Sequence, residues 1–155
     1  MKRFIAVTAA VVAAFGLGTA AAQQKTRISI GTGGTAGVYY PLGGGLATVI
    51  SKYVPNVDAT AEVTGGSVAN LQLIGGGKSE IGFTMADSAW DAYNGLEKFK
   101  DKKVPVRALA VFYPNRMQVA TLDGKGIEKV TDLKGKRVAT GSPGSGTEVM
   151  SMRML

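Results

Sequence analysis

Short runs of apolar and β-branched residues recur along this chain, each followed by a glycine-rich loop and then a helix-forming segment. Residues 27–31 (RISIG) predict a first strand. Residues 41–54 predict the helix after it, because proline suits the first helical turn. Residues 58–64 predict a second strand, and residues 67–77 a helix that ends in glycines. This alternation indicates βαβ units around a mostly parallel sheet, and hence an α/β fold.

The same pattern continues to the last residue. Residues 80–85 predict a third strand and residues 86–96 a third helix, with Asp87 or Ser88 as its N-cap. Two more strands are expected at 106–113 and 116–123, a short helix and turn at 130–136, and another strand at 137–141. Residues 141–155 are expected to form a glycine-rich loop followed by a final helix.

The last helix carries Met150, Met152, Met154 and Leu155 and has neither a glycine C-cap nor a following strand. The sequence therefore predicts that the chain is a piece of a longer protein. It also predicts that these four apolar side chains lack a packing partner.

The N-terminus has the layout of a secretory signal peptide. Lys2 and Arg3 precede an apolar stretch over residues 5–17, and small residues end at Ala22. The alternative is an N-terminal membrane anchor, for which the apolar stretch is marginal in length. Cleavage after Ala22 predicts a periplasmic protein that is not an integral membrane protein. It takes two positive charges from the formal net charge of +7, leaving +5.

The chain contains no histidine and no cysteine. Zinc and copper sites of ordinary type, Ser-His-Asp catalysis and Cys-His catalysis are therefore excluded, and no metal or cofactor is expected. An enzyme would need carboxylates, lysine or a serine-lysine pair. The lysine-rich stretches at 98–103 and 125–137 lack interleaved aromatic residues, so nucleic acid is not an expected partner.

The first glycine-rich loop satisfies a loose dinucleotide-binding spacing, Gly31-x-Gly33-x-x-Ala36. That fingerprint needs a tight turn into the helix, with an acidic residue about 20 positions on. Here Tyr40-Pro41 is expected to delay the helix to about Pro41, because a residue before proline avoids the α region. The acidic residue is missing as well. We therefore reject the dinucleotide interpretation.

Another ligand suits this loop better. Its glycines, Gly33 among them, let backbone N–H groups converge, while Thr32 and Thr35 add hydroxyls and Tyr39 and Tyr40 add amphipathic walls. These groups fit a small polar or carboxylate-bearing solute. The alternative is a surface loop whose tyrosines belong to the core.

Two further strand-to-helix junctions carry polar residues. Ser67 is expected to cap its helix, either as a plain cap or with free N–H groups facing a ligand, and Asn70 could point to solvent or ligand. At the next junction Asp87 is predicted mainly to be the N-cap of the third helix, without a role in ligand binding. Trp90, the only tryptophan, reads as a core residue.

The fourth junction, residues 141–147, is neither a nucleophile elbow nor a Walker A loop. It can cradle an anion at a helix N-terminus, with Ser145 and Thr147 as donors. Ligands of open α/β sheets bind outside the carboxyl ends of the strands, so the four loops are expected to converge on one site.

A family resemblance covers almost the whole mature sequence. The segments IGTGGTAGVYYPLGGGLA, TGGSVANLQLI, EIGFTMADSAWDAY, RALAVFYPNRMQVAT and IEKVTDLKGKRVATGSPGSGTE occur in this order. In this the chain resembles TAXI-type solute-binding proteins, the receptors of tripartite ATP-independent periplasmic (TRAP) transporters.

The resemblance implies a type II periplasmic binding protein fold with two lobes and the ligand between them. It places a first lobe at 23–112, after the signal peptide at 1–22, and a crossing strand with the start of the second lobe at 113–155. It implies capture of a small organic anion, such as glutamate or another carboxylate, and its delivery to a TRAP permease. The ligand residues that it implies are Thr32, Gly33, Tyr39, Tyr40, Ser67, Asn70, Met85, Asp87, Ser88, Ser142, Ser145 and Thr147.

One departure concerns the third junction, where the family often has glutamine or serine before the aspartate and this chain has Met85-Ala86. Two rival functions stay open. An exported α/β hydrolase would use Ser145 with a lysine, and a surface adhesin would bind no solute.

Overall fold

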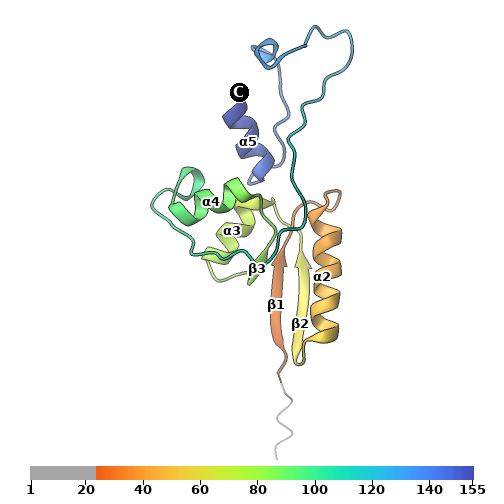
Figure 1. The fold of residues 1–155 in the computed structure, drawn as a ribbon, viewed down its shortest axis with the longest axis vertical. Coiled ribbons are helices and arrows are strands. Elements are labelled where there is room, and N and C mark those ends of the chain that lie inside the picture. The colour runs from red at the N-terminus through yellow and green to blue at the C-terminus, as the bar shows by residue number, and fades with distance from the viewer. Residues whose placement is uncertain (1–23) are drawn as a thin grey trace, which may run out of the picture.

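The computed structural model describes residues 24–155 and has a mixed α/β fold (Figure 1). Its sheet is three-stranded and parallel, with β1 (Thr26–Gly31) between β2 (Val57–Glu62) and β3 (Ile81–Gly82). Ile30 pairs with Ala61 on one side and Ile81 on the other and is fully buried. The sequence-based α/β prediction is confirmed.

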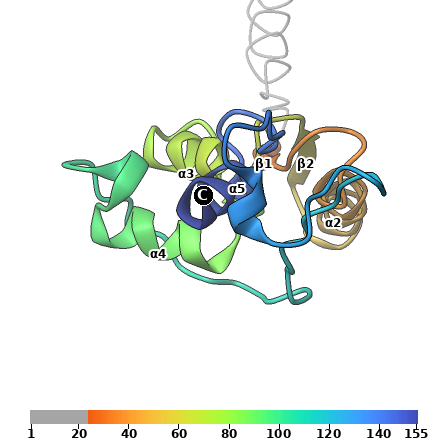
Figure 2. The same ribbon diagram turned by 90° about the horizontal axis from the view of Figure 1, so that it is seen from above.

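Helices cover the sheet from two sides. Helix α2 (Tyr39–Tyr53) lies beside β1 and β2, while α3 (Ser67–Gly75), α4 (Ala86–Asn94) and α5 (Gly146–Met154) gather on the other side of the strands (Figure 2). Two short 3₁₀ helices, η1 (Glu97–Phe99) and η2 (Val130–Leu133), complete the described elements.

Each side of the sheet has its own apolar core. The sheet–α2 core is formed by Ile30, Ala47, Ala59 and Phe83. The α3–α4–α5 core is formed by Val68, Leu71, Ala92, Phe99, Val104 and Val149. Val149 comes from α5, so the last helix is packed against the first part of the chain. Met150 and Met154 are half-buried, whereas Met152 and Leu155 are exposed. The expectation that all four side chains lack packing is therefore wrong for Met150 and Met154.

Helix α2 begins at Tyr39 and not at Pro41. Pro41 still lies in the first turn, where its missing N–H has no intrahelical partner to lose. Tyr39 packs its ring on Phe83, with the ring centroids 5.4 Å apart, and this contact favours a helical start before the proline.

The later strand predictions are wrong. The third strand is only Ile81–Gly82, and no strand forms at 106–113, 116–123 or 137–141. These segments have β-type composition, but a strand also needs a neighbour to complete its hydrogen-bond ladder. Val106 and Phe112 pack against the rest of the molecule, but Leu109 and Val111 between them are 79% and 90% exposed.

The signal-peptide prediction falls on residues outside the described part of the chain. Within residues 24–155, no helix combines the length and apolar character needed to span a membrane.

Candidate functional site

The carboxyl ends of β1, β2 and β3 meet at one edge of the sheet, as parallel pairing requires. The loops into α2, α3 and α4 start there, and the loop before α5 packs against them (Figure 1). This edge therefore gathers most of the predicted ligand residues, and we treat it as the candidate site.

Asn70 ties the ends of the three strands together. Its Nδ2 donates to the carbonyl oxygens of Thr32 and Phe83, both at 2.7 Å, and its Oδ1 accepts from Thr64 Oγ1 at 2.6 Å. Asn70 is fully buried. The expectation that it faces solvent or ligand is wrong, because the strand ends use its donors and its acceptor.

The same arrangement explains Gly31. A Cβ atom at this position would lie 2.6 Å from Asn70 Oδ1, so any larger residue would displace the amide. Thr32 is also fully buried, and its hydroxyl donates to the Glu62 carbonyl at 2.6 Å. Thr32 and Gly33 are both buried at the strand end, whereas Thr35 is exposed in the loop. The first glycine of the nucleotide-like spacing, Gly31, is thus needed to make room for the Asn70 side chain, and not for a nucleotide.

Tyr39 and Tyr40 have different surroundings. The Tyr39 hydroxyl accepts a hydrogen bond from Asn115 Nδ2 at 3.3 Å and lies near Ser67. Tyr40 lines a hollow between α2 and β2 with Thr48 and Ala61. The structure therefore brings Tyr39 to the strand ends, while Tyr40 borders a different surface.

Burial raises the pKa of Tyr39 above its ordinary value of 10.0. Well below pH 10 the phenol is neutral in both folded and unfolded chains. As pH rises through 10, the unfolded tyrosine ionises first, so stability falls until the folded group ionises too.

We expect Tyr39→Phe to reduce the loss of stability between about pH 9 and pH 11 in urea titrations, since the phenylalanine keeps the ring contact. Tyr113, whose pKa burial also raises, will keep some of the dependence. Tyr53→Phe, at an exposed tyrosine, is the control. An unchanged pH dependence for Tyr39→Phe would contradict the role of its burial.

The N-terminus of α3 is closed by the loop before α5. The backbone N–H groups of Val68 and Ala69 both donate to the Gly144 carbonyl, at 3.0 and 3.1 Å. The N-cap of α3 is Gly66, with φ at 111°, and not Ser67 as expected from the sequence. The expected free N–H groups are thus engaged, and their acceptor is a neutral oxygen of the chain itself.

Close backbone approach makes this contact possible. A Cβ at Gly65 would lie 2.6 Å from the Pro143 carbonyl oxygen. A Cβ at Gly146 would lie 2.6 Å from Met85 Sδ and 2.8 Å from Ser67 Oγ. Glycines on both sides therefore let residues 141–146 sit directly on the start of α3.

Ser67 connects two helix N-termini. Ser67 is 2% exposed, and its Oγ accepts from the Met85 backbone N–H at 3.0 Å. Met85 is the N-cap of α4, which corrects the prediction of Asp87 or Ser88, and no side chain caps this helix. Met85 thus contributes its backbone to the site.

Two polar atoms at the start of α4 have no partner among the described residues. They are Oδ1 of Asp87 and Oγ of Ser88, both buried. Buried polar atoms of native proteins are normally hydrogen-bonded, and leaving one unpaired is unfavourable by about 1–3 kcal/mol. The start of α4 therefore offers one acceptor and one hydroxyl that no described residue uses.

The α5 junction is capped by its own residues. Ser145 Oγ accepts from the Glu148 N–H at 3.0 Å, and Glu148 Oε2 accepts from the Gly144 N–H at 2.9 Å. Ser142 and Thr147 are exposed. Ser145 thus serves as a helix cap, and not as the hydroxyl donor that the sequence suggested.

Asp91 and Arg153 are two residues of the site region that sequence reasoning missed. Arg153 binds Asp87 at 3.2 Å and Asp91 at a shorter distance. The hydrogen bond that the Arg153 guanidinium donates to Asp91 raises the pKa of the guanidinium. The spacing of Asp87 and Asp91 places both on one helical face, which is the signal available in the sequence. Arg153 is more than 60 positions away in the sequence, so no local pattern links it to these aspartates.

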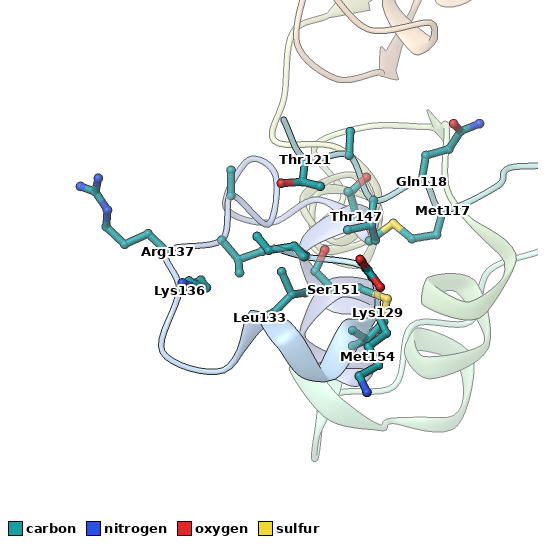
Figure 3. A pocket seen from close by; sticks show the side chains of 17 residues that line it. Met117, Gln118, Thr121, Lys129, Leu133, Lys136, Arg137, Thr147, Ser151 and Met154 are labelled. Atoms are coloured by element: carbon teal, nitrogen blue, oxygen red, sulfur yellow. The ribbon is translucent and has the colours of Figure 1, made fainter. Parts of the chain in front are cut away.

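A second hollow of about 400 Å³ lies between residues 117–139 and α5 (Figure 3). Apolar side chains such as Met117, Leu133 and Met154 line much of it, and Thr147 is its only predicted ligand residue. We favour the strand ends as the site, because buried polar groups from several elements converge there. The described residues contain no cluster of three or more acidic side chains that could hold a metal ion.

The sequence matches the model of the NMT1-like family over residues 30–155. The chain belongs to the NMT1-like family. This is a solute-binding family of the periplasmic-binding type, and its members are usually extracytoplasmic. The small parallel sheet with helices on both sides agrees with one lobe of such a protein.

Proposed function

We propose that this NMT1-like protein is a periplasmic receptor of the TAXI type. It captures a small organic anion, glutamate-like or another carboxylate, and delivers it to a TRAP permease. In this proposal residues 23–112 form the first lobe, residues 113–155 begin a second lobe, and the chain is a piece of a two-lobed receptor. The ligand lies at the strand ends, where residues 141–147 meet α3 and α4.

The contact of Gly144 with α3 supports this proposal most directly. One carbonyl oxygen accepts from two N–H groups at a helix N-terminus, which is the hydrogen-bond arrangement that a carboxylate oxygen would take. A carboxylate would gain more there than a neutral carbonyl, because the helix N-terminus carries partial positive charge. The solute is then expected to displace residues 141–146 from α3.

The unpaired atoms at α4 supply the remaining hydrogen-bond positions. Ser88 can donate to an anionic oxygen, whereas a carboxylate such as Asp87 only accepts and needs a donor from the solute. Tyr39 and Ser67 lie beside these groups. A solute with both a carboxylate and a donor group matches this set.

Calorimetry of the full-length mature protein with a panel of amino acids, organic acids and sugars tests the proposal. We expect a carboxylate to bind. We also expect Ser67→Ala to weaken its binding about tenfold, the loss of one good hydrogen bond. Thr48→Val, on the exposed side of α2, should leave binding unchanged. Binding of a sugar without any carboxylate would contradict the anion part of the proposal.

A further inference from the structure

The outer face of α4 exposes large aromatic side chains. Trp90 is 65% exposed and Tyr93 is 58% exposed, so the prediction of a core tryptophan is wrong. Leu96, just after the helix, is 45% exposed. Figure 2 shows α4 and the turn after it on the side of the molecule away from α2.

Helix geometry explains this exposure. The opposite side of α4 is packed: Ser88 and Ala92 are fully buried, and Asp91 is 6% exposed. Trp90 and Tyr93 are three residues apart and therefore share the other side. Their position follows from how α4 is packed, and local unfolding is not needed to expose them.

Lysines follow directly in the sequence, in a segment that is hydrogen-bonded to Ala92 of α4 and to Leu96 just after it. Phe99 and Val104 are 3% and 6% exposed and anchor this segment in the α3–α4–α5 core. Between and beside them Lys98, Lys100 and Lys102 are exposed. We name the set Trp90, Tyr93, Leu96, Lys98, Lys100 and Lys102 the aromatic–lysine face.

Other charged groups of the segment only partly offset these lysines. Glu97 and Asp101 are acidic and exposed, and Lys103 packs against Gly95 at the end of α4. Residues 97–103 therefore carry four lysines and two acidic residues. The segment is net positive, and the whole chain has a formal net charge of +7.

The chemistry of this face favours a lipid surface over a protein partner. Lysine is depleted in protein–protein interfaces, where arginine is the enriched cation, and this face has lysines and no arginine. Tryptophan and tyrosine are enriched at the headgroup level of membranes, where the ring is buried and its polar end stays hydrated. Each lysine near an anionic membrane strengthens binding by about fivefold.

We propose that the aromatic–lysine face docks this protein reversibly onto an anionic phospholipid surface. Trp90, Tyr93 and Leu96 enter the headgroup region, and the three lysines contact lipid phosphates. Docking of this kind would hold a receptor close to the membrane. The inference does not depend on which solute the protein binds.

The single tryptophan makes the test direct, because its emission reports only on this face. Vesicles containing phosphatidylglycerol should shift the Trp90 emission to shorter wavelength, and the shift should shrink as salt is raised. Vesicles of phosphatidylcholine alone should give little shift. Co-sedimentation with the same vesicles gives the affinity independently of fluorescence.

Two triple variants separate this face from overall charge. Lys98→Gln, Lys100→Gln and Lys102→Gln together should weaken vesicle binding at least about tenfold. Lys125→Gln, Lys134→Gln and Lys136→Gln remove the same charge from another exposed segment and should change it less than about twofold.

Trp90→Ala, followed by sedimentation, should weaken binding as well, and circular dichroism checks that each variant is folded. Equal losses from both triple variants would overturn the proposal, because net charge alone would then explain binding. An unshifted Trp90 emission on anionic vesicles would overturn it too.

Discussion

Replacing Asn70 by alanine should lower the free energy of unfolding by about 3–5 kcal/mol, near the upper end for single substitutions. The change removes two buried hydrogen bonds and one partly buried hydrogen bond that join the ends of β1, β2 and β3. It leaves the carbonyl oxygens of Thr32 and Phe83 without this donor in a dry environment, at a penalty of about 1–3 kcal/mol each. Urea unfolding followed by circular dichroism measures the loss.

A neighbouring residue of the same helix supplies the control. Gln72 is exposed on α3, and Gln72→Ala should change stability by less than about 0.5 kcal/mol. Asn70→Asp keeps the size of the side chain but replaces the donor with an acceptor, so it should destabilise the protein as well. A small effect of Asn70→Ala, similar to that of Gln72→Ala, would show that the strand ends do not depend on this amide.

Replacing Arg153 by methionine should release α5 from α4. Asp91 is only 8% exposed in its side chain and would lose its cation. Breaking one side of a buried pair is worth about 3–5 kcal/mol, but Arg153 is 38% exposed, so we expect about 2 kcal/mol. Amide hydrogen exchange in α5 should accelerate about 30-fold, while exchange in β1 stays slow.

Arg137→Met is the matched control, because Arg137 is exposed in the same half of the chain and forms none of the ion pairs found among the described residues. It should leave α5 exchange unchanged. Faster exchange in β1 as well as α5 would mean that Arg153 supports the whole fold and not the docking of α5.

The docked position of α5 bears on the proposed receptor function. Arg153 and the Gly144 carbonyl both hold the last segment of the chain against the helices of the first part. A solute that takes the α3 N–H groups must compete with Gly144 for them. A stronger Arg153 contact would therefore weaken the apparent affinity for the solute. It favours the solute-free state in which Gly144 occupies the α3 N–H groups, so less of the protein is ready to bind.

Local patterns correctly predicted most of the first half of the molecule. The alternating segment at 58–64 corresponds to β2, the run ending in glycines to α3, and residues 86–96 to α4 and its left-handed Gly95, with φ at 72°. These features depend on neighbouring residues, through side-chain periodicity and glycine conformation. The sequence analysis also named Tyr39, Ser67 and Ser88 as candidate ligand residues, and the structure places all three at strand-to-helix junctions; their role in binding stays a prediction.

Long-range contacts decided the rest. The segment 106–113 has strand composition but no partner strand, and composition does not reveal whether a partner is present. Asn70 reads as a polar residue near a ligand loop, yet its amide matches carbonyl groups 38 and 13 positions away. The exposure of Trp90 likewise follows from the packing of α4, which its own residues do not specify.

The sequence by itself determined the α/β class, the parallel βαβ order and the absence of histidine and cysteine chemistry, because each depends on residue type and short spacing. Only the tertiary structure decided that Asn70 binds the strand ends, that Gly144 closes α3 and that Arg153 meets Asp87 and Asp91. These hydrogen bonds and ion pairs join residues far apart in the sequence. Their geometry exists only after both apolar cores have brought the helices and strands together.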